Sequence, residues 1–230
     1  MPWTKTEIQN HIKAAALLGQ IKNAAFSYAS KNPKTTEYEL QQFILKKFQE
    51  NKLKLDKDPP IVAFGTSTAI PHYFPPQDSV ELKPDTLILI DIWSRLKKRN
   101  SPFADITWIG YHGKSVPMKI QRAFNTVIKT RDNCLKFIES ELRLGKMPVG
   151  KDVDKVGCNV LVKAGYKKNI LHRTGHSIGF HSPHGKQGHL SLKNEEPILT
   201  NIGYTIEPGV YFKGEFGIRS EINFYIIKNK

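Results

Sequence analysis

The chain has 230 residues, of which 39% are hydrophobic, and a formal net charge of +14. No apolar stretch approaches the roughly 20 residues that a membrane-spanning helix requires, and the first residues lack the apolar core of a signal peptide. We therefore expect a cytoplasmic protein without membrane contact. The densest basic clusters, Lys97-Lys98-Arg99 and Lys167-Lys168, are short and have no aromatic residues between them, which disfavours specific nucleic-acid binding.

The first half of the chain predicts two helices followed by strands. Thr4-x-x-Glu7 and Thr36-x-x-Glu39 both fit a capping box, which satisfies the first free N–H groups of a helix. The first helix should run to about Ser30, with an apolar face that includes Ile8, Ile12, Ala15 and Ile21. Strands are expected near Ile61–Phe64, Leu87–Trp93 and Asp105–Gly110.

The second half repeats this order. A long helix is expected from about Pro117 to Leu144, and a shorter one from about Asp152 to Ala164, ended by Gly165. Strand-like segments follow near Ile178, Gly203–Glu207 and Glu221–Ile227. Helices then strands, twice over, predict an α+β fold with an internal pseudo-repeat. No flexible linker divides the halves, so residues 1–230 are expected to form one domain. Its two cysteines, Cys134 and Cys158, have no metal-ligand spacing and are predicted to be buried, reduced thiols on helices.

Four acids lie where acids are disfavoured, inside or at the end of predicted buried strands. They are Asp91, Asp105, Glu207 and Glu221, and His176 lies between the second and the third. A buried ionised acid is costly unless it is paired or bound to a metal. Any one of them alone is more often a salt-bridge or turn residue, and Arg219 could neutralise Glu221. The set of five is balanced for two divalent cations, since four negative charges match four positive ones.

Such a set can support hydrolysis. Carboxylates together with an imidazole accept Mn, Fe, Co or Zn. Two ions about 3.5–4 Å apart can share a water and generate hydroxide near neutral pH. The residue pattern alone leaves this interpretation and simple charge pairing about equally supported.

A family resemblance favours the metal site. The segments that carry it are His172-Arg-Thr-Gly-His176-Ser-Ile-Gly179, Thr205-Ile-Glu207-Pro-Gly-Val-Tyr and Gly217-Ile-Arg-Ser-Glu221-Ile-Asn, with Leu89-Ile-Asp91, Ala104-Asp105-Ile-Thr and Ala69-Ile-Pro-His72-Tyr upstream. Together they resemble the pita-bread-fold dinuclear metallopeptidases, which include aminopeptidase P, prolidase and methionine aminopeptidase. The sequences of these motifs are most similar to those of the Xaa-Pro-cleaving branch. The resemblance implies two pseudo-symmetric halves of helices packed on a curved, mainly antiparallel sheet.

The resemblance also implies residue roles. Asp91 would hold one metal through both oxygens, Asp105 and Glu221 would bridge two metals, and His176 and Glu207 would bind the other. Glu207 would also be the general base for a metal-bridged water. His72 would contact the substrate and stabilise the tetrahedral intermediate, and Arg219 would orient the carboxylates from behind. The expected cofactors are two divalent ions, Mn, Co, Fe or Zn, and the expected partners are peptide substrates, with the protein a monomer or a homodimer.

Three features depart from the family pattern. The family's second histidine falls seven residues after the metal-binding one, where this chain has Pro183. His184 is one residue late and His181 two early, and we favour His184 because a loop absorbs a one-residue insertion. The aspartates Asp91 and Asp105 are 14 residues apart, which predicts a longer hairpin loop at Lys97–Pro102. The catalytic-type helices begin near the first residue, so we expect no N-terminal accessory domain, as in the single-domain methionine aminopeptidases.

The predicted function is therefore metal-dependent hydrolysis of an N-terminal peptide bond, of the Xaa-Pro type. The alternatives are a methionine aminopeptidase-like activity, a non-catalytic module of the same fold that binds protein or RNA, and a metal-free hydrolase that resembles creatinase. The intact set of acids disfavours the binding module, because drift would be expected to erode at least one ligand. It disfavours the metal-free hydrolase because without metal these charges lack compensation.

Overall fold

The computed structural model describes residues 2–227. Within them, helices α1 (Lys5–Lys31) and α2 (Glu37–Glu50) precede the first strands, and helices α3 (Met118–Arg143) and α4 (Gly150–Lys163) precede the last ones. Two short 3-10 helices are η1 (Gly65–Ala69) and η2 (Lys167–Asn169). The strands are β1 (Leu53–Lys54), β2 (Ile61–Phe64), β3 (Thr86–Leu96), β4 (Ala104–His112), β5 (Gly203–Ile206), β6 (Gly209–Phe212), β7 (Phe216–Arg219) and β8 (Ile222–Tyr225).

The helices begin where the sequence predicts. In α1 the Glu7 amide donates to Thr4 Oγ1 at 3.3 Å and the Thr4 amide donates to Glu7 Oε2 at 2.7 Å, and α2 has the same capping box at Thr36 and Glu39. The predicted apolar face of α1 is wrong at Ile12, which is 48% exposed. The buried face consists of His11, Ala14, Leu18, Ile21, Ala25 and Ala29. The buried His11 ring bonds the Phe103 carbonyl oxygen through Nδ1 at 2.7 Å, which allows a polar side chain to occupy this face.

The strands of each half pair antiparallel. Strand β3 is central in the first half: β1 and β2 pair on one side and β4 on the other, with Trp93 opposite Asp105. In the second half β5 pairs with β8 and β6 with β7. The predicted strand at Ile178 is not a continuous strand but isolated bridges from Ser177 to Tyr204 and from Ile178 to His184. The last strand is shorter than predicted, and the β6–β7 hairpin was not predicted at all.

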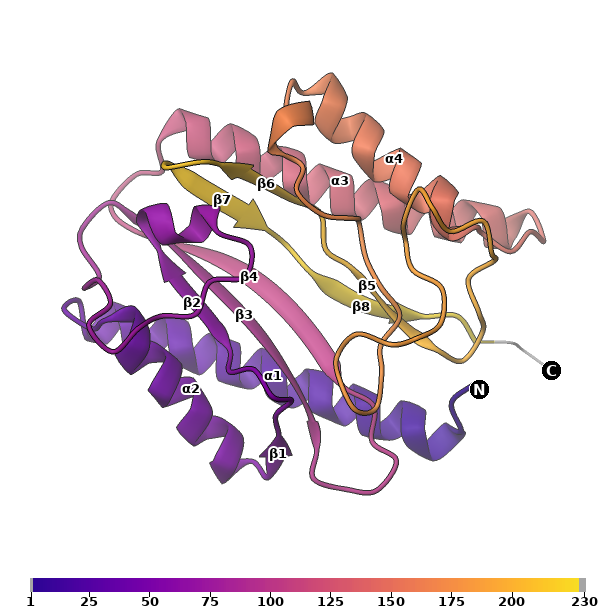
Figure 1. The fold of residues 1–230 in the computed structure, drawn as a ribbon, viewed down its shortest axis with the longest axis horizontal. Helices are drawn as coiled ribbons and strands as arrows, with labels where there is room; N and C mark the ends of the chain where they lie inside the picture. The colour runs from indigo at the N-terminus through magenta and orange to yellow at the C-terminus, as the bar shows by residue number, and fades with distance from the viewer. Residues whose placement is uncertain (1, 228–230) are drawn as a thin grey trace.

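The two halves are joined at their centre by side-chain and backbone hydrogen bonds. The Asn223 amide on β8 accepts from the Asp105 N–H at 3.1 Å and donates to the Asp105 carbonyl at 2.5 Å. The Glu221 N–H donates to the Thr107 carbonyl oxygen at 3.0 Å. In Figure 1, α1 and α2 lie beside β2–β4, and α3 and α4 lie over β5–β8, so the strands of both halves meet between the helix pairs. This arrangement confirms the α+β fold class and brings Asp105 and Glu221 to the same seam.

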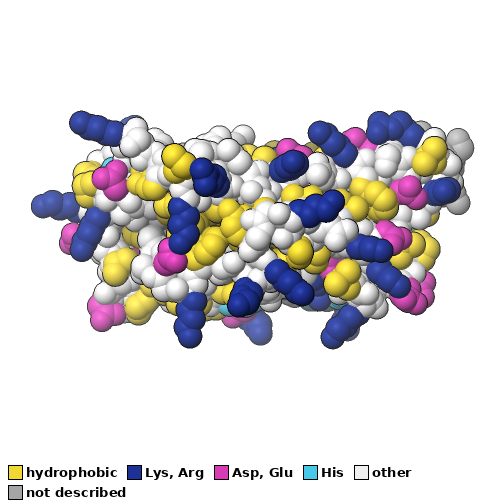
Figure 2. All heavy atoms as spheres, turned by 90° about the horizontal axis from the view of Figure 1, so that it is seen from above, with side chains coloured by type: hydrophobic (Ala, Val, Ile, Leu, Met, Phe, Trp, Pro, Cys, Tyr) yellow, Lys and Arg dark blue, Asp and Glu magenta, His cyan; other side chains and the backbone are white. Residues whose placement is uncertain are grey.

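Among residues 2–227, no helix combines the length and apolarity needed to cross a membrane. Lys and Arg side chains are distributed over the face drawn in Figure 2, with Asp and Glu between them. Both cysteines are free thiols on helices, but only Cys134 is buried, and Cys158 is partly exposed.

A buried glutamate fixes the loop that precedes the site. Glu37, at the start of α2, is fully buried, accepts from the Phe64 N–H at 2.6 Å and accepts from the Tyr73 hydroxyl at 2.6 Å. Burial raises the pKa of Glu37, and its hydrogen bonds to Tyr73 and Phe64 oppose that rise. Because Tyr73 follows His72 directly, this contact positions the loop that carries His72.

We predict that Tyr73→Phe lowers the free energy of unfolding by about 1.5–3 kcal/mol, the range for a hydrogen bond to a charged group. Tyr38→Phe is the matched control, since the Tyr38 hydroxyl makes no hydrogen bond to residues 2–227. Urea denaturation of both variants measures the difference. Equal midpoints would show that the Glu37 contact does not stabilise this loop.

Candidate metal centre

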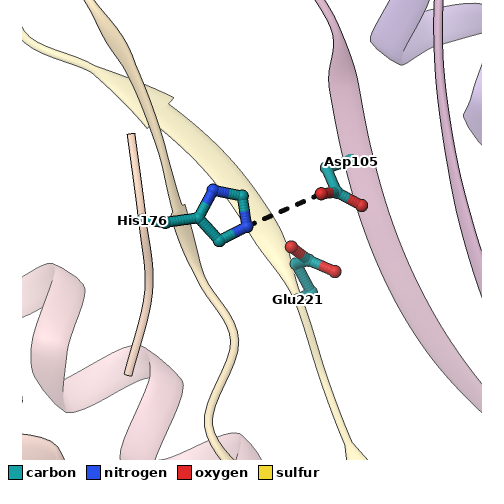
Figure 3. A group of neighbouring side chains, drawn as sticks. All are labelled: Asp105, His176 and Glu221. Atoms are coloured by element: carbon teal, nitrogen blue, oxygen red, sulfur yellow. Dashed lines mark ion pairs between the residues drawn. The ribbon is translucent and has the colours of Figure 1, made fainter. Parts of the chain in front are cut away.

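The structure brings the predicted acids and His176 to one cavity. Strand β3 supplies Asp91 and β4 supplies Asp105, while Glu207 directly follows β5 and Glu221 lies between β7 and β8. Ligand atoms of Asp105, His176 and Glu221 all lie within 4.8 Å of one another, and Figure 3 shows these three side chains pointing toward a common space. Asp91 and Glu207 line the same cavity, which has a volume of about 740 Å³. Asp91, Asp105 and Glu221 are buried, and Glu207 is partly exposed.

His176 directs an unprotonated nitrogen at the acids. Its Nδ1 lies 2.9 Å from the Ser177 carbonyl oxygen, so the tautomer that satisfies this carbonyl carries the proton on Nδ1. Nε2 lies 3.2 Å from Glu207 Oε1 and 3.7 Å from Asp105 Oδ2. Burial lowers the pKa of His176 to about 4, so the ring is neutral at pH 7 and these contacts are not salt bridges. A nitrogen lone pair and carboxylate oxygens repel one another unless a cation lies between them.

The backbone around His176 fixes this orientation. The Thr205 N–H donates to the His176 carbonyl at 2.8 Å, and the Glu207 N–H donates to the Thr174 carbonyl at 2.7 Å. The His176 N–H in turn donates to Thr205 Oγ1 at 3.1 Å. The segment around His176 therefore lies alongside β5, which places His176 and Glu207 side by side.

Two buried carboxylate oxygens have no hydrogen-bond partner within the described residues, Asp91 Oδ1 and Glu221 Oε1. Burial raises the pKa of Glu221, and the charges of Asp105, Glu207 and Asp91 raise it further. Burial likewise raises the pKa of Asp105, with additional contributions from Asp91 and Glu207. Such an anionic cluster needs compensating positive charge. Oxygen donors with one imidazole nitrogen fit a divalent cation of the Mn, Fe, Co or Zn type.

Arg219 connects two of the acids, Asp91 and Glu221, through its guanidinium group. Its Nη2 pairs with Asp91 Oδ2, so the direct partner of this arginine is Asp91 and not Glu221. Its Nε donates to Thr107 Oγ1 at 3.1 Å, and the Thr107 hydroxyl donates to Glu221 Oε2 at 2.8 Å. Arg219 Nη1 also donates to the Pro71 carbonyl at 3.3 Å. One guanidinium therefore orients Asp91 directly, Glu221 through Thr107, and the segment before His72.

A second relay extends from the same guanidinium. Arg219 Nη1 donates to the Tyr211 hydroxyl at 2.7 Å, and that hydroxyl lies 2.8 Å from His172 Nε2. His172 Nδ1 lies 2.8 Å from the Arg173 carbonyl oxygen, so Nε2 accepts the Tyr211 proton. Burial raises the pKa of Tyr211 to about 12, so the hydroxyl keeps the proton it donates.

The structure distinguishes the three candidate substrate histidines. His72 and His184 both line the cavity of the acids. The His184 ring lies 4.2 Å from the His176 ring, centroid to centroid. His181 does not line this cavity. Both His181 and His184 are exposed, and both line a neighbouring cavity. The tight loop that separates them is closed by hydrogen bonds from the Gly179 N–H to the Pro183 carbonyl and from the Gly185 N–H to the Ser177 carbonyl.

Asp154 of α4 is a structural residue that the sequence patterns missed. It is buried, its Oδ1 accepts from the Thr174 N–H at 2.9 Å, and its Oδ2 accepts from the Leu192 N–H at 2.7 Å. It therefore holds both sides of the segment that presents His176. An acid on an amphipathic helix such as α4 gives no sequence signal for this role. Thr107 could have been found, because it lies two residues after Asp105 and so on the same strand face.

Comparison with known proteins assigns the chain to a family. It belongs to metallopeptidase family M24, whose sequence model matches residues 9–228. Among curated relatives, an uncharacterized peptidase from Staphylococcus epidermidis is 27% identical over 229 residues, which cover 98% of this chain and 60% of that protein. The first relatives matched are covered over about half to three fifths of their own length.

Solved structures share the fold. Recombinant prolidase from Thermococcus sibiricus matches with a TM-score of 0.85 and 23% identity, over 99% of this chain and 58% of that one. An X-prolyl aminopeptidase from Caenorhabditis elegans, described as a cytosolic enzyme with a di-nuclear active site, matches with a TM-score of 0.80 and 20% identity, over 97% of this chain and 36% of that one. These likenesses confirm the predicted pita-bread fold.

We predict that Asp154→Asn lowers the free energy of unfolding by about 1–3 kcal/mol, because an amide leaves one of the two buried N–H donors facing another N–H. Denaturant titration is the measurement. Asp132→Asn is the control, since Asp132 makes a half-exposed ion pair with Arg131, and such a pair contributes at most about 1 kcal/mol. If both variants unfold at the same denaturant concentration, Asp154 does not hold the His176 segment.

Proposed function

We propose that the protein is a metal-dependent aminopeptidase that hydrolyses N-terminal peptide bonds, with a preference for Xaa-Pro substrates. The observation that carries the proposal is the neutral His176 nitrogen facing carboxylate oxygens at 3.2 and 3.7 Å. That contact is unfavourable unless a cation lies between these atoms. We treat residues 1–230 as one catalytic domain that acts on peptides in the cytoplasm, as a monomer or a homodimer.

The charge of the cavity favours two divalent ions. The four acids contribute four negative charges and Arg219 one positive charge. Two divalent ions and one hydroxide bring this buried set to neutrality, with His176 uncharged. When bound, such ions lower the pKa of water and polarise the scissile carbonyl. Asp91, Asp105, His176, Glu207 and Glu221 would hold them.

Glu207 is the residue that we assign to proton transfer. Asp91 and Glu221 each receive a hydrogen bond from the Arg219–Thr107 group, and Asp105 is buried. Within residues 2–227, the Glu207 carboxylate accepts a hydrogen bond only at Oε1, from the Thr205 hydroxyl at 3.1 Å, and its side chain is 17% exposed. Its remaining oxygen is free to accept a proton from the nucleophile and to return it to the leaving amine.

His72 and His184 would contact the substrate. Both border the acids without belonging to the buried cluster, and a histidine there can donate to a developing oxyanion. The Xaa-Pro preference rests on the Ile206-Glu207-Pro208-Gly209 and His172–Gly179 segments, which resemble that branch, and on relatives described as prolidase and X-prolyl aminopeptidase.

The direct test is peptide hydrolysis after loading with single metals. We expect chelator-treated protein to lose activity and Mn²⁺ or Co²⁺ to restore it, with Xaa-Pro peptides cleaved faster than matched Xaa-Ala peptides. Preferential cleavage of Met-Ala peptides would instead favour the methionine aminopeptidase alternative. A folded protein that binds metal and cleaves no peptide would overturn the proposal.

For Glu207→Gln we expect turnover to fall at least about 10²-fold, the lower range for loss of a general base, with a much smaller loss of metal affinity because one oxygen ligand remains. Glu215→Gln is the control, because Glu215 makes an exposed ion pair with Lys119. Steady-state kinetics and calorimetric metal titration separate the two effects. Near-normal turnover of Glu207→Gln would contradict the assigned base.

His184→Ala should lower kcat about 10²-fold, as expected for a donor to developing charge, whereas His181→Ala should leave kcat within about twofold. The two residues share one loop, so the pair controls for loop damage. Kinetics on a neutral dipeptide provide the comparison. A larger loss for His181→Ala would reverse the assignment of the second histidine.

A further inference from the structure

A second cavity lies next to the acids and has the opposite charge. We call it the basic cleft; it has a volume of about 960 Å³. Six basic side chains line it: Lys54, Arg95, Lys97, Lys98, Arg99 and Lys186. The acidic side chain on its lining is Glu7, whose Oε2 accepts from the Thr4 N–H in the capping box of α1. The cleft thus gathers the Lys97-Lys98-Arg99 cluster, for which the proposed reaction has no use.

The walls of the basic cleft are held together by the fold. One wall is the loop between β3 and β4, and the other is the segment from Ile178 to Gln187. The Phe103 N–H of the first wall donates to the Gly179 carbonyl of the second at 2.9 Å. Arg95 Nη1 donates to the Lys98 carbonyl at 3.2 Å, which fixes the base of the basic loop. The longer hairpin between Asp91 and Asp105 therefore builds a defined wall.

The positive charge of the basic cleft is not neutralised within the described residues. None of its six Lys and Arg side chains makes an ion pair with an acid among residues 2–227. Clefts lined by one sign of charge concentrate oppositely charged ligands and accelerate their association. An anionic ligand is therefore the chemistry that this cleft favours.

The basic cleft and the cavity of the acids are neighbours that share lining residues, Ser182 and His184. The first cavity has a mixed lining. Its acids are Asp56, Asp58 and the four predicted ligand acids, and its basic side chains are Lys57, Arg173, Lys193 and Arg219. A chain that lies across Ser182 and His184 would extend from the proposed reaction site into the basic cleft. This placement suits a peptide whose N-terminal residues lie at the acids and whose downstream acidic residues lie in the basic cleft.

We infer that the basic cleft binds the downstream part of peptide substrates and selects peptides with acidic residues beyond the cleaved bond. The inference rests on the proposed aminopeptidase function, because that function sets which end of the peptide lies at the acids. It assigns the basic loop to substrate selection. The charge-complementary occupant is a peptide, since the cleft shares Ser182 and His184 with a site of peptidase type.

The experiment compares three substrates of the metal-loaded protein. One is a neutral Xaa-Pro dipeptide, and two are octapeptides with the same first two residues, followed by either glutamates or glutamines. We expect kcat/KM for the Glu octapeptide to exceed that for the Gln octapeptide about tenfold at low salt, the lower range of electrostatic steering. The difference should shrink at about 1 M salt, where screening is strong.

Matched variants test the residues. K97Q/K98Q/R99Q removes three charges from the basic loop, whose side chains are exposed. K163Q/K167Q/K168Q removes three exposed charges at the end of α4 and in η2, away from both cavities. We expect the first variant to lose most of the preference for the Glu octapeptide while it cleaves the dipeptide as before. The second should keep both properties.

Equal kcat/KM for the two octapeptides, or equal losses in both variants, would overturn the inference. If no peptide is cleaved, the proposed function fails, and fluorescence anisotropy with a labelled Glu octapeptide still tests the cleft. Binding that the K97Q/K98Q/R99Q variant loses would then support the cleft alone. A single-stranded RNA octamer provides the alternative. If it binds more tightly than the Glu octapeptide, and the same variant no longer binds it, the cleft is a nucleic-acid site and the peptide inference is overturned.

Discussion

The structure depends on one electrostatic constraint, the concentration of buried negative charge around an uncharged histidine nitrogen. Asp105 and Glu221 have raised pKa values because burial and neighbouring acids disfavour their charged forms. The nearest cation, Arg219, forms its direct ion pair with Asp91 and reaches Glu221 only through Thr107. The basic side chains of the protein therefore neutralise only part of the negative charge of this cluster. The remaining negative charge fits divalent cations.

The fold satisfies this constraint by joining two half-sheets at the site itself. The Asn223 side chain bonds both backbone groups of Asp105, and the Glu221 N–H bonds the Thr107 carbonyl oxygen. Residues distant in sequence thus become neighbours through hydrogen bonds of the protein itself, from the Asn223 side chain and from the backbone. The positions of the ligands are set by the same interactions that hold the halves together, so the site is preorganised and loses little conformational entropy when a cation binds.

The residues of the site were predictable from sequence to the extent that local pattern determines them. Acids stand out inside apolar strands, and Thr-x-x-Glu marks helix starts because both interactions are local in the chain. The choice between His181 and His184 was not determined, because it depends on a loop closed by hydrogen bonds at Gly179 and Gly185 that no periodicity encodes. The pairing of Arg219 with Asp91, 128 residues apart, and the support from Asp154 likewise arise only in the folded chain.

The strands and the loop of the longer β3–β4 hairpin are under different constraints: the register of the strands is fixed, and the length of the loop is not. The strand positions of Asp91 and Asp105 tolerate no change of register, since a one-residue slip would turn the side chains to the opposite face. The loop between them is free to lengthen, because closing a slightly longer loop costs little conformational entropy. Basic residues in this loop add positive charge beside the site without altering the geometry of the predicted metal ligands. Selection of the substrate can therefore change at this loop while the hydrolytic chemistry stays constant, which is the physical reason to look for specificity in the hairpin and for catalysis in the strands.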